Sequence, residues 1–317
     1  MMSGLRARLE ARQTAIYFSA VLLAFVAAWL MPATRLLSAA VDPLLALMLF
    51  ATFLQVPLGE LRRAMRDLRF VGVLLAANFA GVPLLVAALL PWVPGDPLIR
   101  LGFLLVMLCP CVDYVVAFAH MGRADARSLL AATPLLLAGQ MLLLPAYLGI
   151  FLGEDARQLV RWEPFAAAFV WLIAVPLALA AACQAWARRG GLGARVVDGL
   201  GLLPVPATAA VLAVVVAAVT PGLGLALDAV RGVAPVYLAF AVLAPLLGWT
   251  LARRLPARQR LAVAFSVSTR NSLVVLPLGL AVAGALPLVP AVIVTQTLIE
   301  LVAELIYVRL AARQVPA

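Results

Sequence analysis

Two short polar stretches interrupt the long apolar runs of this 317-residue chain and contain the side chains best able to do chemistry. Residues 108–114 read LCPCVDY, and residues 266–272 read SVSTRNS. Polar and charged groups at mid-membrane depth are costly and usually functional. We therefore predict that these stretches provide the side chains that bind a solute, namely Cys111, Asp113, Arg270, Asn271 and Ser272.

Arg270 is the most costly of these residues, because placing an arginine at the centre of a membrane helix costs about +2.5 to +3.5 kcal/mol. We expect it to have a partner, with Asp113 as the first candidate and Glu300 as the second. Two interpretations of such a pair stay open. It either locks the two stretches together permanently, or it exchanges partners while a solute is moved.

Cys109 and Cys111 flank Pro110 and also have two interpretations. Cysteine packs as a small hydrophobe. Its thiolate is also a soft ligand that suits a thiophilic solute such as trivalent arsenic or antimony. Positions i and i+2 lie on different helix faces, so only one thiol would line a site. With three cysteines and one histidine in the chain, we predict no disulfide framework, no metal site and no cofactor.

A polar stripe of three residues follows near the C-terminus, where Gln296, Glu300 and Glu304 are spaced four apart and share one helix face. Glu300 is the deepest carboxylate and is a candidate proton carrier or partner of Arg270. Glu304 is closer to the membrane interface and is expected to snorkel or to pair with Arg309. Asn78 is expected to make an ordinary hydrogen bond between helices.

The elements that carry these residues are predicted to be membrane helices. The chain is 66% hydrophobic and 12% charged, with a mean hydropathy of +1.10, which is typical of a polytopic membrane protein. Its 24 basic residues, all arginines, divide into 18 on loops of one side, five on the other side, and Arg270 within a span. This bias predicts an inner-membrane protein with both termini cytoplasmic and argues against nucleic-acid binding. We expect ten spans, at about 14–31, 38–58, 70–90, 98–120, 128–152, 162–187, 196–219, 229–252, 259–285 and 287–311.

The ten spans divide into five plus five, so that residues 1–317 form one all-α transporter domain with inverted repeats at about 14–152 and 162–311. The fourth and ninth spans then run in opposite directions, and their polar stretches could meet in mid-bilayer. Pro110 removes a backbone donor and must kink or unwind the fourth span. Broken helices in matching halves are the best sequence indication of a transporter's binding site.

This layout resembles the bile acid:sodium symporter superfamily over about residues 14–311, which implies ten spans with broken, crossing helices 4 and 9. Residues 110–115 look like the Pro-Cys segment of arsenical-resistance permeases, so Cys111 falls on the thiol that they need. The chain departs from that group in having Ser272 and Leu273 after Asn271, where those permeases carry a glutamate. Sodium-coupled members carry Glu and Gln where this chain has Ser266 and Arg270. A guanidinium offers no acceptor to a cation, so we expect transport without sodium.

The sequence therefore predicts a secondary transporter that exports an arsenite- or antimonite-type oxyacid across the lipid bilayer by proton antiport. Cys111 would contact the solute, Asn271 and Ser272 would add polar contacts, and Glu300 and Asp113 would couple transport to the proton. The alternative is an organic-anion transporter, with sodium as its coupling ion, in which Arg270 binds a carboxylate or sulfonate. An enzyme is not expected, because the chain has no His-Glu-x-x-His motif and no nucleophile elbow.

Overall fold

The computed structural model describes residues 2–55, 67–112, 114–153, 167, 169–223, 226–280, 282 and 288–314. The described residues are helical apart from connecting segments and one isolated β-bridge. They form two compact units, Met1–Leu58 with Glu163–Gly224 and Gly59–Trp162 with Leu225–Ala317. Each unit therefore combines a segment from the first half of the chain with one from the second half.

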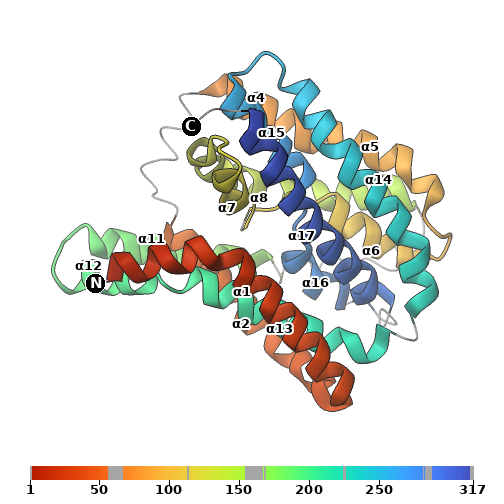
Figure 1. Cartoon of the computed structure of the whole chain (residues 1–317), viewed down its shortest axis with the longest axis horizontal. Helices are drawn as coiled ribbons and strands as arrows, with labels where there is room; N and C mark the ends of the chain where they lie inside the picture. Colours follow the sequence, from red (N-terminus) through yellow and green to blue (C-terminus); the bar gives the residue numbers. More distant parts are fainter. Residues whose placement is uncertain are drawn as a thin grey trace. The chain divides into compact units, whose positions relative to one another are not determined.

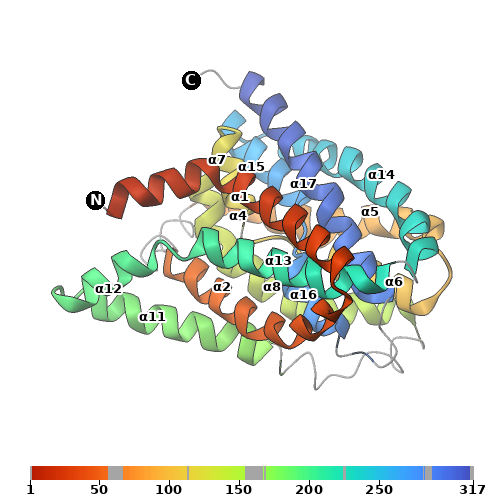
Figure 2. The ribbon, with the colours of Figure 1, turned by 60° about the horizontal axis from the view of Figure 1, so that its bottom comes forward.

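The first unit is built on the packing of α1 along α13, with α2 lying against both α11 and α13 (Figure 2). Gln184 on α11 donates two hydrogen bonds to the last carbonyls of α2, at Phe53 and Leu54. The turn between α11 and α12 needs two residues with positive φ and uses Gly190 and Gly191 there. The bounds are α1 (Met2–Leu30), η1 (Pro32–Ala40), α2 (Val41–Gln55), η4 (Phe169–Ala174), α11 (Val175–Ala187), α12 (Leu192–Leu200) and α13 (Pro204–Leu223).

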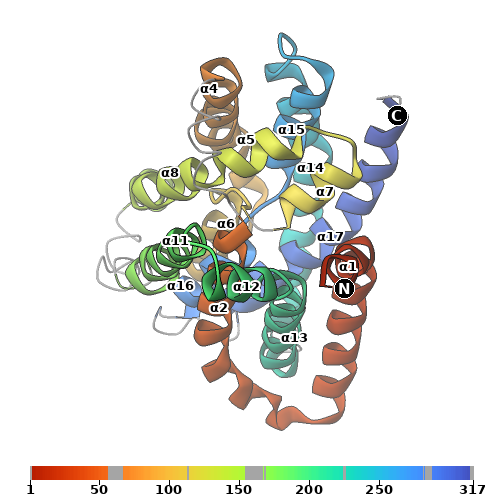
Figure 3. The same cartoon turned by 90° about the vertical axis from the view of Figure 1, so that its left-hand side faces the viewer.

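The second unit places α17 at its centre, in contact with α14, α6, α16 and α7, while α14 packs along α15 (Figures 1 and 3). Its helices start where the sequence provides caps: Asp67, Asp96 and Asp125 each accept hydrogen bonds from backbone N–H groups of the first turn. The bounds are α4 (Leu68–Ala76), η2 (Ala77–Gly81), α5 (Val82–Leu89), η3 (Leu90–Trp92), α6 (Pro97–Met107), α7 (Val115–Met121), α8 (Ala126–Leu152), α14 (Leu227–Leu251), α15 (Ala257–Ser268), α16 (Ser272–Leu280) and α17 (Leu288–Gln314).

Several of these helices are long and apolar enough to cross a membrane, which supports an integral membrane protein. In the described part of the chain, four qualify by length and composition, and a fifth does if α12 and the first part of α13, bent by 41°, form one span. The expected ten spans are not confirmed. One physical reason is that α6, α7, α15 and α16 are separate short helices, because the fourth and ninth expected spans are broken.

Both breaks occur where the sequence predicts them. The last turn of α6 ends at Met107, and Cys109 N still reaches Val106 O at 3.4 Å before Pro110 stops the hydrogen-bond pattern. In the second break, Thr269 has extended backbone angles (φ −100°, ψ 127°) directly after α15. Both helices therefore leave backbone groups that need partners elsewhere.

Candidate functional site

The two breaks pair with each other through their backbones. Cys111 N–H donates to Thr269 O at 3.1 Å, and Asn271 N–H donates to Cys109 O at 2.8 Å. These bonds form an antiparallel bridge between Pro110 and Arg270. An unwound segment needs such partners when no water is near, because each unpaired backbone group costs free energy. The prediction that the two polar stretches meet is confirmed, and we call this meeting point the crossing.

The crossing is buried. Cys109, Cys111, Arg270, Asn271 and Ser272 each have an exposed fraction of 1% or less. Asp113, the first predicted partner of Arg270, lies outside the described residues. The structure therefore brings together four of the five predicted solute-binding residues, and their role in binding stays a prediction.

The guanidinium of Arg270 is surrounded by oxygen atoms of uncharged groups. Its Nη2 donates to Ser266 O at 2.6 Å, Val267 O at 2.8 Å and Asn78 Oδ1 at 3.0 Å. Its Nη1 donates to Met107 O at 3.4 Å. Ser266 and Val267 are in the last turn of α15, where the helix dipole favours a positive charge. The charge is thus stabilised by the ends of broken helices and one amide.

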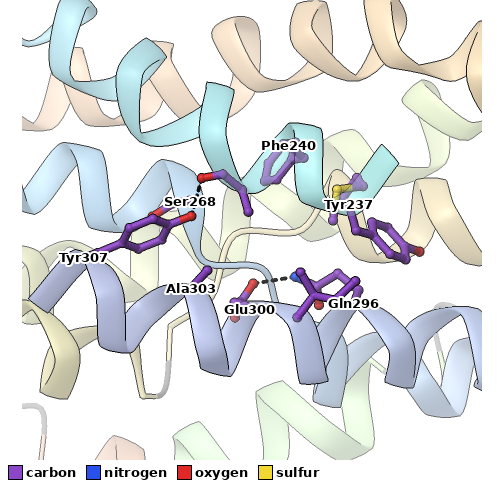
Figure 4. Close-up of a pocket in the computed structure, with 10 residues that line it drawn as sticks. Tyr237, Phe240, Ser268, Gln296, Glu300, Ala303 and Tyr307 are labelled. Atoms are coloured by element: carbon purple, nitrogen blue, oxygen red, sulfur yellow. Dashed lines mark hydrogen bonds between the residues drawn. The ribbon is translucent and has the colours of Figure 1, made fainter. Parts of the chain in front are cut away.

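Glu300, the second predicted partner of Arg270, binds its backbone and not its guanidinium. Glu300 Oε2 accepts from Arg270 N–H at 2.7 Å and from Gln296 Nε2, and Oε1 accepts from the hydroxyl of Tyr114 at 2.7 Å. Figure 4 shows Glu300 and Gln296 extending from α17 with their hydrogen bond drawn. Because Tyr114 directly precedes α7 and Arg270 lies in the second break, Glu300 ties α17 to both broken helices.

Glu304 corrects one expectation. It neither snorkels nor pairs with Arg309, because it is fully buried and its Oε1 lies 2.7 Å from Thr269 Oγ1. Buried carboxylates are rare without a partner. Glu304 was expected near a membrane interface because it lies toward the end of the last predicted span. In the structure, α17 packs against the crossing one turn beyond Glu300 as well, and this packing buries Glu304.

Asn78 has a larger role than the ordinary hydrogen bond expected of it. Its Nδ2 donates to Ser266 Oγ at 3.0 Å, and its Oδ1 accepts from Arg270. It lies in η2, a π-helical turn between α4 and α5, and such turns are frequent at functional sites. The sequence signal that could have found it was a lone amide in an apolar span. The sequence could not show that Asn78 would contact Arg270, which lies 192 residues away along the chain.

Two cavities lie close to the described residues of the crossing. A cavity of about 10 Å³ lies beside Glu300 and Gln296, and Tyr237 and Phe240 of α14 also line it (Figure 4). A larger, mostly apolar groove of about 520 Å³ runs between α14, α15 and α17 and reaches Ser268 and Tyr307. The cavity of about 10 Å³ beside Glu300 has room for about one water molecule.

Comparison with known proteins gives one result. The sequence model of the sodium bile acid symporter family matches residues 42–224, which is more than half of the chain. The matched segment contains Asn78 and the first break, and the second break lies beyond it. No curated protein matches the chain.

Proposed function

Because the chain belongs to the sodium bile acid symporter family, we propose that it moves a small solute by alternating access at the crossing of its two broken helices. Members of this family are transporters, so the chain is not an enzyme. We further propose that the chain has ten spans in an inverted five-plus-five repeat. Both termini would be cytoplasmic, and the protein would lie in the inner membrane. The inside-positive arginine bias and the two matching breaks support it.

One observation carries the proposed mechanism: the guanidinium of Arg270 fills a set of four oxygen atoms at the crossing. Carbonyl and amide oxygens are the ligands that hard cations prefer. A sodium ion would need these same acceptors, and the guanidinium, which is itself only a donor, already uses them. In our proposal Arg270 takes the place of a coupling cation, so transport does not depend on sodium.

The same observation bears on the solute. Both terminal nitrogens of the guanidinium already donate hydrogen bonds to carbonyl and amide oxygens. Only Nε lacks an acceptor among the described residues. Arg270 is therefore a poor anchor for an organic anion in this conformation, and a neutral solute fits better. We propose export of a thiophilic oxyacid of the arsenite or antimonite type, with Cys111 as its ligand and Asn271 and Ser272 as polar contacts.

Protons are the proposed coupling ion, because two buried carboxylates, Glu300 and Glu304, lie beside the crossing. Glu300 contacts both breaks, through Tyr114 and Arg270, so a change at either break acts on it. Asp113 is kept in the proposal as a further coupling residue.

The family name favours a second candidate, an organic-anion transporter of the bile-acid type with sodium as its coupling ion. Arg270 would then have to leave its oxygen acceptors to bind a carboxylate or sulfonate. That step exposes four buried acceptors, each of which costs free energy without a donor.

Purified protein in liposomes separates the two candidates. We expect arsenite flux driven by a pH gradient and unchanged when sodium is replaced by choline. Cys111→Ser should lower the flux at least tenfold, whereas Cys183→Ser, a matched change on α11 in the other unit, should leave it unchanged. Sodium-driven uptake of taurocholate without arsenite flux would reject the oxyacid proposal and establish the second candidate.

A further inference from the structure

The two buried carboxylates of α17 differ in the number of hydrogen-bond donors that they receive. Glu300 accepts from three donors, the hydroxyl of Tyr114, the N–H of Arg270 and the amide of Gln296. Glu304 has one short contact, with the hydroxyl of Thr269, and a weaker interaction with the side chain of Ser268, and no hydrogen bond to its Oε2 forms in the described part of the chain. Donors stabilise the charged form of a carboxyl group, and burial without donors disfavours it. Glu300 is thus arranged for a carboxylate and Glu304 for a carboxylic acid.

The hydroxyl of Thr269 strengthens this distinction. Its Oγ1 lies 2.6 Å from Phe265 O and 2.7 Å from Glu304 Oε1. A threonine hydroxyl has a single hydrogen. If Glu304 were ionised, two acceptors would compete for that hydrogen. If Glu304 carries a proton on Oε1, it donates to Thr269 Oγ1, and the hydrogen of Thr269 then goes to Phe265 O. The protonated form satisfies both short contacts.

We propose that Glu304 is a proton-binding site, occupied in the conformation seen here, and that Glu300 is the ionised counter-charge of Arg270. Among the described residues of the site, the buried charges then balance, with one positive group, one negative group and one neutral acid. Sequence reasoning favoured Glu300 as the proton carrier, and the hydrogen-bond pattern favours the carboxyl group one helical turn further along α17.

Thr269 connects this proton site to the crossing. Its hydroxyl contacts Glu304, and its backbone carbonyl accepts from Cys111 N–H in the other break. Release of the proton breaks the Glu304 O–H bond, transfers the proton to water once the site opens, and leaves a carboxylate. That carboxylate attracts the hydrogen of Thr269 away from Phe265 O, in the last turn of α15. The charge of Glu304 therefore acts on a residue that holds the two breaks together.

The other charged and titratable groups near Glu304 are few. Among the described residues, Glu300 is the carboxylate that acts on Glu304, and Tyr307 lies one turn away on the same helix, with its hydroxyl bonded to Ala241 O. The described titratable groups on the breaks and on the elements packed against α17 are Arg270, Cys109, Cys111, Tyr114, Arg100 of α6, the exposed His120 of α7, and Asp228, Arg231 and Tyr237 of α14. Among the described residues, no arginine contacts the carboxyl group of Glu304 to balance its ionised form.

Infrared difference spectroscopy of the purified full-length protein in lipid nanodiscs tests the proton site directly. A protonated carboxylic acid has a carbonyl stretching band that a carboxylate lacks. We expect this band in the wild type at neutral pH, its loss in Glu304→Gln, and its persistence in the matched variant Glu300→Gln. Thr269→Val should shift the band, since it removes the hydroxyl that contacts Glu304. This variant also gives an independent result if Glu304→Gln does not fold. Absence of the band, its loss in Glu300→Gln alone, or an unshifted band in Thr269→Val would overturn the proposal.

The link to transport rests on the proposed function, and liposomes test it separately. Glu304→Gln should lower arsenite flux driven by a pH gradient at least tenfold. Exchange of labelled for unlabelled arsenite should continue in the same variant. Flux that remains pH-driven in this variant would overturn the coupling role of Glu304. If the infrared band is assigned to Glu304 but the protein does not move arsenite, the proton site is supported. Only the proposal that arsenite is the solute is then rejected.

Discussion

Arg270 carries a buried positive charge that is tethered to the backbone beside the oxygen atoms it binds. A dissolved cation can leave such a set of oxygens, but a guanidinium can leave only if its own segment moves. The backbone N–H of the same residue donates to Glu300. Arg270 therefore joins α17, α4–η2 and α15 through one side chain and one peptide group, and its removal affects all of them.

The variant Arg270→Gln tests the tethered-cation proposal. The change leaves buried oxygen acceptors without their donor, at about 1 to 3 kcal/mol for each unsatisfied group, so we expect a lower Tm in sodium-free buffer. Glutamine leaves the oxygen acceptors available, and sodium should then raise the Tm in a concentration-dependent way. The readout is thermal unfolding in detergent with sodium, potassium or choline chloride.

Arg231→Gln is the matched control, because the side chain of Arg231 is 71% exposed and its ion pair among the described residues is with Asp228 in the preceding helical turn. It should leave the Tm nearly unchanged, because ion pairs on the surface contribute little to stability. A sodium-stabilised wild type, or an Arg270→Gln variant indifferent to sodium, would contradict the assignment.

At the scale of elements, the packing of α14 on α15 positions the second break. Gly248 lets these helices approach closely: a Cβ there would lie 2.8 Å from Ala264 Cα and 3.1 Å from Val263 O. Small residues permit such contacts in membrane proteins. Because Ala264 accepts a hydrogen bond from Ser268 Oγ, separation of the two helices would displace the turn that leads into the break.

Gly248→Ala should therefore destabilise the protein by about 1 to 3 kcal/mol, the usual cost of overpacking, and slow transport. Gly72→Ala is the control, since a Cβ at Gly72 meets nothing within 4 Å. That change should stabilise α4 by about 0.4 to 1 kcal/mol, because alanine restricts the unfolded chain. Thermal unfolding of both variants measures the difference. Equal Tm values would show that the α14–α15 contact is looser than described.

At the scale of the whole molecule, the number and orientation of spans are set by the bilayer. Length and composition identify four spans, or five with the bent pair, in the described residues. Broken helices escape such a criterion because each half is too short to cross alone. The arginine distribution gives independent information on topology, since loops rich in arginine stay on the cytoplasmic side.

An even number of spans places both termini on the same side of the membrane, and the arginine bias makes that side cytoplasmic, so we predict that both termini are cytoplasmic. Fusions of a fluorescent protein that folds only in the cytoplasm should be bright at either end. Alkaline phosphatase, which needs the periplasm, should be inactive at both ends. A bright fusion at one end with an active phosphatase at the other would mean an odd number of spans and would end the inverted five-plus-five proposal.

The sequence by itself determined the membrane class and the positions of the two breaks. Both follow from local chemistry: apolar runs partition into lipid whatever they pack against, and Pro110 lacks the backbone donor that a continuous helix would use there. The tertiary structure decided which groups neutralise the buried charge. Asn78 was expected to make an ordinary contact, Glu304 was expected near an interface, and Thr269 was not singled out. Partners 192 residues apart depend on which helix faces meet, and the pattern along one helix cannot specify that.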